Sequence, residues 1–317
     1  MSPYVLLYKT LVPWKYHRYL QLAGGNRDKC HETLRHGTFY EEYDAYGFAG
    51  KSDNERRSYL TDALRDKICR QVNSHQGEKI IANKYSTFLR LKSFYHRKVW
   101  LLHDDETVTD AARHGSKQGC LVLKPSDNCG GRGVQLLNAN CLSEWQSLLS
   151  DKQGWLAEER IIQDERMARW NPSSVNTVRT NTFLLNGKVR IFTAFIRTGR
   201  KGSFVDNGLQ GGIFASIDTD NGQIFTDGYD EHQERHTQHP DSHVSFHGEF
   251  IPRWDEAVAL SKALAQSFPD MVYIGWDLAL TPSGWEPVEA NRGEFIAQQI
   301  TQGRGLRKEF EEACGLL

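Results

Sequence analysis

The sequence predicts an α+β fold in which a mainly helical region, residues 1–96, precedes two sheet-containing lobes, residues 97–172 and 173–317. Two patterns carry this prediction. Before residue 97 apolar residues recur at helical spacing among charged ones, whereas beyond it short apolar runs bounded by polar turns indicate strands. Since no repeat, low-complexity segment or long Pro/Gly/Ser linker interrupts the chain, we expect the lobes to pack closely together.

The composition predicts a compact, water-soluble protein. Of the 317 residues, 39% are hydrophobic, enough to bury a substantial core. The 39 Lys and Arg residues nearly balance the 40 Asp and Glu residues, so no overall charge favours nucleic acid or an anionic membrane. The apolar run before Lys9 is too short for a membrane span or a signal-peptide core. The six cysteines form no Cys-x-x-Cys pair, which together with this run predicts a cytoplasmic protein with reduced thiols.

The clearest helical pattern in the first region covers Asp53 to Ile68. There Leu60, Leu64 and Ile68 share helical spacing and the intervening positions are polar, which predicts an amphipathic helix with one buried face. Tyrosines and phenylalanines are dense between Phe39 and Phe48, and we expect them to pack against the next lobe.

The strand-like runs of the two lobes share short length, apolar composition and polar boundaries. They are Lys98–Leu102, Cys120–Lys124, Val134–Leu137, Trp155–Glu159, Val178–Leu185, Val189–Ile196, Gly212–Ile217 and Ile274–Leu280. Two helices are expected among them, at Leu142–Leu149 and Asp255–Phe268. The second half of the chain therefore has antiparallel character.

A glycine-rich stretch follows the second of these runs. Lys124 lies at a strand end, and Gly130, Gly131 and Gly133 then surround Arg132. Because glycine is common wherever the backbone turns through positive φ, the stretch is either a flexible turn between strands or a lid over phosphate groups. The local sequence leaves both interpretations open.

A candidate metal site lies near the C-terminus. If the chain turns as a hairpin between Pro282 and Gly284, alternation along the strands directs Asp277, Glu289 and Asn291 to one face. Three oxygen ligands of this kind suit Mg²⁺, completed by nucleotide phosphates and water. The alternative is a surface hairpin with solvated acids. The apolar neighbours disfavour it, since acids among buried residues need a partner.

Several motifs taken together resemble an ATP-grasp enzyme, and more closely the sugar-transfer-associated ATP-grasp family. The resemblance extends over nearly the whole chain from about residue 40 and rests on motifs in the correct order: Asn83–Phe88, Leu123–Pro125 with the Gly-Gly-Arg-Gly loop, Ala157–Ile161, Val175–Thr180 and the Asp277, Glu289 and Asn291 set. It implies a fold in which two α+β lobes clamp ATP. Each motif alone is weak evidence, and it is their order that makes the signal specific.

The resemblance also implies roles for individual residues. The residues implied to bind nucleotide are Lys84 and Lys124 at the phosphates, Ser126, Gly130, Gly131, Arg132 and Gly133 in a mobile flap, Glu158, Glu159, Arg160 and Ile161 near the adenine, and Glu165 or Asp164 at the ribose. Arg179, Arg190 and Arg292 are implied to face the transferred phosphate or the substrate, where a guanidinium binds phosphate bidentately. Cross-strand ion pairing is the structural alternative for Arg190. Arg197 and Lys201 either guide an anionic substrate or lie in a solvated loop, and the sequence favours the loop.

Five histidines crowd one segment: His232, His236, His239, His243 and His247. His232 and His236 are four apart, a spacing that can bind zinc on a helix. Pro240 and the polar composition favour a loop instead, which we interpret as lining the acceptor pocket.

The reaction that the resemblance implies is ATP- and Mg²⁺-dependent ligation of a small-molecule carboxylate to an amine through an acyl phosphate. A kinase acting on a hydroxyl acceptor would share the same motifs, and a non-catalytic nucleotide-binding protein is the third interpretation. In this interpretation the substrates to consider are sugar-linked acids and amino acids. We expect no nucleic acid partner and no membrane span in the chain. The sequence does not indicate the oligomeric state.

Overall fold

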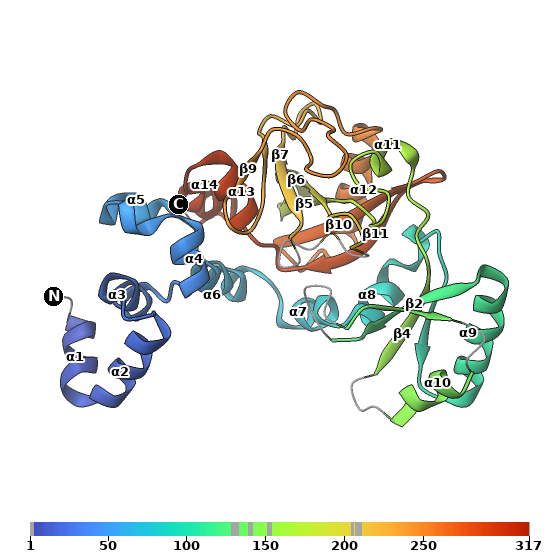
Figure 1. The fold of residues 1–317 in the computed structure, drawn as a ribbon, viewed down its shortest axis with the longest axis horizontal. Coiled ribbons are helices and arrows are strands. Elements are labelled where there is room, and N and C mark those ends of the chain that lie inside the picture. Colours follow the sequence, from blue (N-terminus) through green and yellow to red (C-terminus); the bar gives the residue numbers. More distant parts are fainter. Residues whose placement is uncertain are drawn as a thin grey trace.

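The chain forms three parts in space, as seen in a computed structural model that describes residues 3–127, 133–138, 142–150, 154–203, 206 and 211–316. Figure 1 shows N-terminal helices at one end, a large sheet in the middle and a smaller sheet at the other end. The arrangement is the α+β fold with a leading helical region that the sequence predicts. No helix in these described ranges is long and apolar enough to cross a membrane.

The first part consists of short helices and one-turn 3₁₀ segments. They are α1 (Pro3–Leu11), α2 (Pro13–Leu22), α3 (Arg27–His36), α4 (Tyr40–Ala45), α5 (Asp53–Ser58), α6 (Asp62–Val72), α7 (His75–Ala82) and α8 (Lys84–Leu91), with η1 (Phe48–Gly50) and η2 (Lys92–Phe94) between them. Most begin at a capping residue: the side chains of Asn26, Ser52, Thr61, Ser74 and Asn83 each accept a backbone N–H of the following turn.

The single helix expected over residues 53–68 is wrong, because two helices occupy this segment. Tyr59 has extended backbone and Thr61 caps a new helix, so the chain breaks between α5 and α6. The burial that the pattern predicts is confirmed nonetheless: Leu60 and Ile68 are buried in one cluster, with Leu64 packed against it. The apolar spacing follows the buried face, whereas the capping threonine decides where the helix begins.

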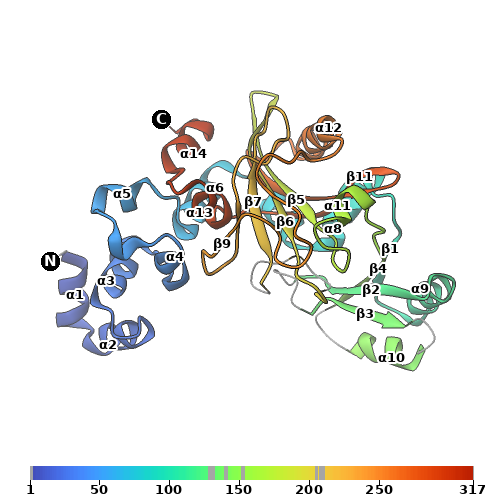
Figure 2. The same cartoon turned by 45° about the horizontal axis from the view of Figure 1, so that its top comes forward.

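The smaller sheet is four-stranded and antiparallel, in the order β1-β4-β2-β3. Its strands are β1 (Val99–Leu102), β2 (Cys120–Pro125), β3 (Gln135–Asn138) and β4 (Trp155–Glu159). The helices α9 (Asp105–Gln118) and α10 (Leu142–Ser147), followed by η3 (Leu148–Ser150), pack on it around the buried Trp145. Figure 2 shows both helices beside this sheet, away from the large one.

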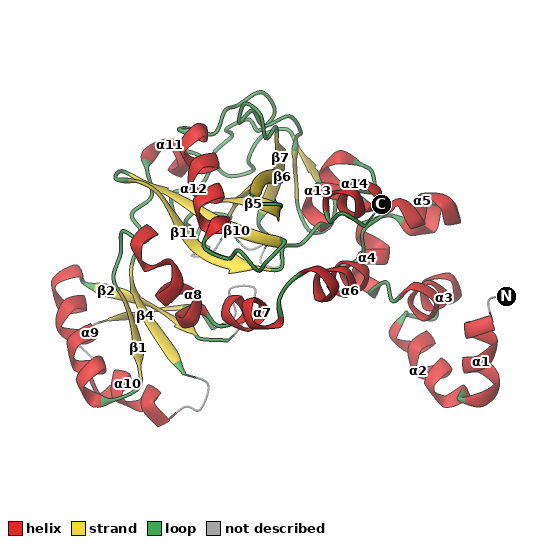
Figure 3. Cartoon of the chain, turned by 180° about the vertical axis from the view of Figure 1, so that it is seen from behind, coloured by secondary structure: helices red, strands yellow, loops and turns green. Residues whose placement is uncertain are grey.

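The larger sheet is seven-stranded and antiparallel, in the order β11-β10-β5-β6-β7-β8-β9. Its strands are β5 (Thr177–Leu185), β6 (Lys188–Thr198), β7 (Ile213–Ile217), β8 (Gly228–Tyr229), β9 (Arg235–His236), β10 (Tyr273–Thr281) and β11 (Gly284–Asn291). The accompanying helices are α11 (Glu165–Ala168), α12 (Trp254–Gln266), α13 (Ile296–Gln302) and α14 (Arg307–Ala313). Figure 3 shows α13 and α14 between this sheet and the N-terminal helices α4 and α5, and α11 and α12 on the other side of the sheet.

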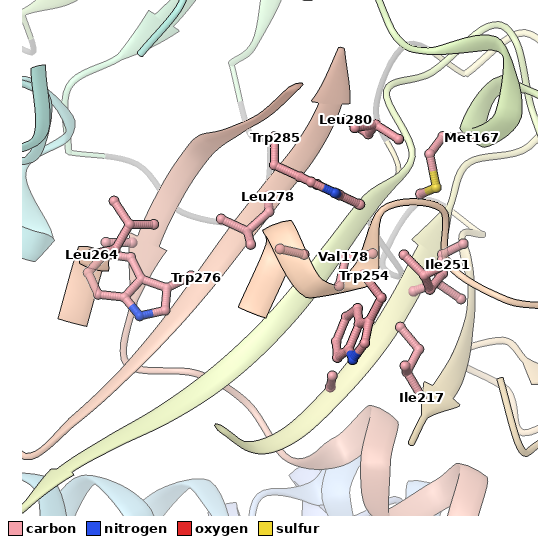
Figure 4. Close-up of a cluster of buried hydrophobic side chains, with 14 of the residues drawn as sticks. Met167, Val178, Ile217, Ile251, Trp254, Leu264, Trp276, Leu278, Leu280 and Trp285 are labelled. Atoms are coloured by element: carbon pink, nitrogen blue, oxygen red, sulfur yellow. The ribbon is translucent and has the colours of Figure 1, made fainter. Parts of the chain in front are cut away.

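The two faces of the large sheet differ in chemistry. One face packs under α12, where Val178, Trp276 and Leu278 join the largest hydrophobic cluster, shown in Figure 4. Because side chains alternate along a strand, the residues between these point to the opposite face. There Arg179, Asp277 and Asn181 are buried polar side chains. This polar face carries the candidate site.

Candidate nucleotide and metal site

The strands of the large sheet align the predicted metal ligands in register. The hairpin turns between Thr281 and Gly284, as the sequence predicts, and places Asp277 directly opposite Glu289. On the other side Asp277 pairs with Arg179 of β5, so three charged side chains cross neighbouring strands in one row. Asn291 lies opposite Gly275, in the next row on the same face.

Two arginines hold the Asp277 carboxylate. Arg179 donates through Nε to Oδ1 and through Nη2 to Oδ2, the latter at 2.7 Å, and Arg197 donates through Nη2 to Oδ2 at 2.8 Å. Asp277 is only 2% exposed. Burial by itself raises the pKa of Asp277, but the two guanidinium groups outweigh it and the pKa is lowered. Asp277 therefore stays ionised and orients both arginines.

Arg197 does not lie in a solvated loop, which corrects the expectation from the sequence. It is in β6, two residues after Phe195, which lies opposite Arg179. Residues two apart on a strand point to the same face, so Arg197 shares the polar face with Arg179. Its guanidinium also contacts Thr177 Oγ1 and lies 3.7 Å from Asp206. The alternation of the preceding strand was the signal for this position, since Arg197 follows Phe195 at the strand spacing of two.

The side chains of Glu289 and Asn291 are held by fewer ion pairs and hydrogen bonds than that of Asp277. Lys84 Nζ lies 3.3 Å from Glu289 Oε1, and the Glu289 side chain keeps 28% of its surface exposed. Asn291 Oδ1 accepts the Gly293 N–H at 2.6 Å, while its Nδ2 is buried and has no hydrogen-bond partner among the residues that the structure describes. A buried amide with an unused donor is costly unless a ligand or water completes it. The two side chains therefore have capacity left for a bound group.

On the small sheet, Lys124 and Glu158 form an ion pair on one face. Lys124 Nζ lies 2.8 Å from Glu158 Oε2, and Arg97 Nε donates to the same oxygen at 3.0 Å. Burial raises the pKa of Glu158, but Lys124 and Arg97 outweigh burial and lower it to about 2. Glu158 is thus a buried carboxylate that keeps the lysine in place.

The neighbouring Glu159 points to the other face of β4. It accepts the Lys98 N–H at 2.7 Å and contacts His114 of α9. The strand register therefore separates the two acids, and Glu158 is the one that accompanies Lys124.

Arg97 connects the two sheets and was not anticipated from the sequence. It precedes β1, yet its Nη1 donates to Glu286 Oε2 at 2.7 Å and to the Pro287 carbonyl at 2.9 Å, both in β11. Its Nη2 is buried with no hydrogen-bond partner among the described residues. Arg97 follows a short aromatic stretch rather than a recognisable motif, so the pattern gave no signal for it.

Lys84 also joins the lobes. Its backbone N–H donates to the Ser126 carbonyl at 3.0 Å, and its side chain reaches Glu289 on the large sheet. Ser126 is buried and donates its own N–H to the Gly154 carbonyl at 3.1 Å, which fixes the start of the predicted flap. Gly133, at the far end of the flap, has φ 78°, a left-handed conformation that favours glycine. Gly130, Gly131 and Arg132 lie outside the described residues.

The segment after β4 leads to α11. Arg160 and Glu165 are exposed, whereas Ile161 and Asp164 are half-buried. The Asp164 side chain caps α11 and pairs with Arg166, and its N–H donates to the Leu280 carbonyl at 2.8 Å. Contact of these residues with a nucleoside stays a prediction.

Two of the predicted arginines lie apart from the Asp277 group. Arg190 is exposed and lies opposite Phe183 of β5. It is five residues before Phe195 on β6, and Phe195 is the residue opposite Arg179. Its guanidinium lies 5.7 Å from the centre of the Phe192 ring. Arg292 Nε forms an ion pair with Glu78 of α7, at 2.5 Å from Glu78 Oε2. Roles for both in catalysis remain predictions, and neither contacts Asp277.

The histidine segment forms a loop around the short β8–β9 hairpin. Within the described residues, the one group of three or more His, Cys, Asp or Glu side chains close enough to share a metal is Asp230, Glu234 and His236. Asp230 already accepts the N–H groups of His232 and Glu234 at 2.9 Å, which explains the cluster as a tight turn. His232 is not part of it, and the segment is not helical, which agrees with the loop that the sequence favours over a zinc site.

His239 fixes this loop, and its burial makes the stability of the protein depend on pH. It is buried; its Nε2 donates to the Gly199 carbonyl at 2.9 Å and its Nδ1 accepts the Asp241 N–H at 3.2 Å, so both nitrogens are used by the neutral ring. Burial lowers its pKa below the ordinary 6.5. The stabilisation by neutral His239 is therefore present above pH 6.5 and is lost as the pH falls through the lowered pKa.

We expect the melting temperature of the wild-type protein to fall between pH 7.5 and about pH 5 by more than that of a His239→Gln variant, since glutamine does not titrate. Differential scanning calorimetry at the two pH values measures this. A His232→Gln variant is the control, because His232 keeps 81% of its side chain exposed. Equal acid sensitivity of the wild-type and His239→Gln proteins would contradict the assignment.

Comparison with known proteins places this site in a family. No curated protein matches the sequence. Among solved structures, D-cycloserine synthetase DcsG is similar, at 14% identity and a TM-score of 0.49 over 80% of this chain and 78% of that one. D-alanyl-alanine synthetase A from Vibrio cholerae is similar at 11% identity and 0.48, over 77% of this chain and 67% of that one. N5-carboxyaminoimidazole synthase from Aspergillus clavatus gives 12% identity and 0.45, over 74% of this chain.

The chain spans 51% of the length of the Aspergillus protein. The pattern of one family, described as sugar-transfer associated ATP-grasp, matches residues 137–315, more than half of the chain. This match covers β10 and β11, with Asp277, Glu289 and Asn291, as well as Arg179 on β5. The chain belongs to the sugar-transfer associated ATP-grasp family, and its two lobes form the ATP-grasp fold.

Proposed function

We propose that this protein is an ATP-dependent ligase that joins a small-molecule carboxylate to an amine through an acyl phosphate. One observation carries the proposal: cationic side chains from α8 and from the large sheet meet the carboxylates of the β10–β11 hairpin. Lys84 contacts Glu289, and Arg179 and Arg197 hold Asp277 beside it. Phosphoryl transfer needs this combination, because catalysis rests on positioning and charge neutralisation rather than on a protein nucleophile.

The two lysines are the proposed phosphate ligands. Lys124 and Lys84 are linked through the chain at Ser126, which accepts the Lys84 N–H and lies two residues after Lys124. Each lysine now neutralises a glutamate, Lys124 at Glu158 and Lys84 at Glu289. A lysine ammonium has three donors, so it can contact a phosphate oxygen while keeping its carboxylate partner. In this proposal Glu158 positions Lys124 for the nucleotide.

The residues also fit a magnesium ion. Glu289 and Asn291 supply the hard oxygen donors that Mg²⁺ prefers, on one face of a rigid strand. Because Asp277 already accepts from two arginines, we assign it chiefly to positioning Arg179 and Arg197, with its carboxylate next to the metal ligands. When bound, the ion would neutralise phosphate charge.

The proposed reaction proceeds in two steps. A carboxylate oxygen of the substrate attacks the γ-phosphorus of ATP, the bond to the bridging oxygen breaks, and ADP leaves. The amine then attacks the acyl carbon, loses a proton, and expels phosphate as the amide forms. Arg179 and Arg197 lie where they can bind the anionic carboxylate and phosphoryl group, since guanidinium groups match both geometries. A sugar-linked acid or an amino acid is the substrate class that we would screen first.

The test is a screen of carboxylate and amine pairs that follows ADP, phosphate and product mass together. The proposal expects one ADP and one phosphate for each amide formed. AMP and pyrophosphate as products would contradict it, and a phosphorylated product without free phosphate would indicate a kinase instead. A Glu289→Gln variant should abolish turnover, and full activity in that variant would contradict the metal assignment.

A further inference from the structure

A groove lies along α6, away from the proposed nucleotide site. One pocket of about 260 Å³ is bounded by α3, α5, α6 and α14, and a second hollow of about 450 Å³ adjoins it over Ala63 and Lys67. We call the two together the α6 groove. Figures 1 and 3 show its helices at the end of the molecule opposite the four-stranded sheet that carries Lys124. The groove is thus separate from the site described above.

The lining of the α6 groove is predominantly basic. Six basic side chains line it, against three acidic ones: Arg35, Arg56, Arg57, Lys67, Arg70 and Arg307 against Glu32, Asp53 and Asp66. The whole chain has a net charge of −1, so this excess is local. Like charges gathered around one hollow repel one another, and a bound anion relieves that repulsion.

Ion pairing inside the protein accounts for only part of this charge. Arg56 pairs with Glu32 and Asp28, and Arg307 pairs with Glu311. Asp66 forms an ion pair with Arg65, which does not line the groove. These pairs remove two acids and two bases from the balance, and Asp53 is the acid that remains.

Four basic side chains are left without an ion pair in the described part of the chain: Arg35, Arg57, Lys67 and Arg70. Arg35 shows the deficit most directly: it lines the groove, and its buried Nε has no hydrogen-bond partner among the described residues. A buried guanidinium N–H normally has an acceptor, as Arg65 has in the Gly293 carbonyl at 2.6 Å. Because Arg35 also has no carboxylate partner in the described part of the chain, a bound oxyanion would provide its counter-charge.

The floor of the groove is partly apolar. Tyr59, Ala63 and Leu64 line it beside the basic side chains, and Tyr59 is buried. A lining of this type suits a small organic molecule with a negatively charged head group, because the apolar body packs on the floor while the oxygens meet the guanidinium and ammonium groups.

We propose that the α6 groove binds a small molecule through a phosphate or carboxylate group. Arg57, Lys67 and Arg35 contact the oxyanion in this assignment, and the ligand is distinct from ATP. The proposal does not depend on the ligase reaction, since no residue of the groove belongs to the proposed catalytic machinery.

Isothermal titration calorimetry of the full chain tests the proposal, with inorganic phosphate in one arm and malonate in the other. The nucleotide site is first saturated with the Mg²⁺ complex of a non-hydrolysable ATP analogue, which also occupies the position of the transferred phosphate. We expect one saturable site per chain, weakened about tenfold by Lys67→Ala and by Arg57→Ala, because each removes a charge-assisted hydrogen bond. Binding in one arm identifies the head group, and binding in both indicates a general oxyanion site.

An Arg18→Ala variant is the matched control. Arg18 is an exposed arginine on α2, outside the groove, and its loss should leave the affinity unchanged. Lys67 and Arg57 are exposed as well, so their replacement is not expected to disturb folding, which the melting temperature checks. Absence of saturable binding in both arms, or equal affinity in all three variants, would overturn the proposal.

Discussion

Replacing Arg179 with leucine is expected to lower the free energy of unfolding by about 2–3 kcal/mol, because the buried Asp277 carboxylate loses two charge-assisted hydrogen bonds and keeps only Arg197 as its counter-charge. Arg179 is buried and makes two hydrogen bonds to Asp277, which is itself 2% exposed. In the variant Arg197 alone would hold that carboxylate, and the pKa of Asp277 would rise. Urea denaturation followed by circular dichroism measures the loss.

Arg190→Leu is the matched control for this prediction. Arg190 lies on the adjacent strand of the same sheet but is exposed, with a guanidinium that contacts only the Phe192 ring among the described contacts. Its replacement should leave the free energy of unfolding nearly unchanged. If the two variants lose the same stability, the Arg179–Asp277 pair does not hold the sheet as described. If Arg190→Leu alone impairs turnover, the role predicted for Arg190 is supported independently of stability.

The strands were predictable because their sequence signal is local. Trp155–Glu159 coincides with β4, and the expected run Ile274–Leu280 lies within β10. Such runs are short, apolar and bounded by turns, so each can be recognised without its neighbours. The two-residue strands β8 and β9 have no such run, because their pairing depends on the turn between them.

Helix boundaries were harder to predict than helical burial. The Leu60, Leu64 and Ile68 spacing predicted one buried face and was right about it. The spacing contained no information about Thr61, whose side chain accepts the Leu64 N–H and starts a new helix. A capping residue in the middle of an amphipathic pattern is therefore a stronger boundary signal than the pattern itself.

The candidate site was predictable where one hairpin determines it. The turn after Thr281 brings the two strands of the hairpin together, but its register alone would place Asp277 opposite Val288. A register shift between Asp277 and Leu278 moves the pairing to Glu289, and the sequence pattern gives no signal for that irregularity. Arg97 and Arg197 were missed because their partners, Glu286 and Asp277, are distant in sequence. The Arg97 contact depends on how the two sheets pack, which no local pattern contains. The Arg197 contact lies within one sheet and depends on which strands are neighbours: alternation gives the face of Arg197 but not its partner.

Replacing Lys124 with methionine is expected to weaken binding of Mg·ATP by about 10- to 100-fold, because a charge-assisted contact to phosphate is lost. The chain offers a control in Lys98, an exposed lysine just before the neighbouring strand β1 of the same sheet. Lys98→Met should leave the affinity unchanged. Isothermal titration calorimetry with ATP and magnesium measures all three proteins.

Loss of Lys124 also removes a partner of Glu158, so weaker ATP binding has two possible causes. In Lys124→Met the buried Glu158 keeps only Arg97, and the pKa of Glu158 rises from about 2. The double variant Lys124→Met/Glu158→Gln separates the causes, because glutamine needs no counter-charge. If Lys124 binds phosphate, the double variant regains stability but not ATP affinity. Recovery of ATP affinity would instead mean that Lys124 acts only by compensating Glu158.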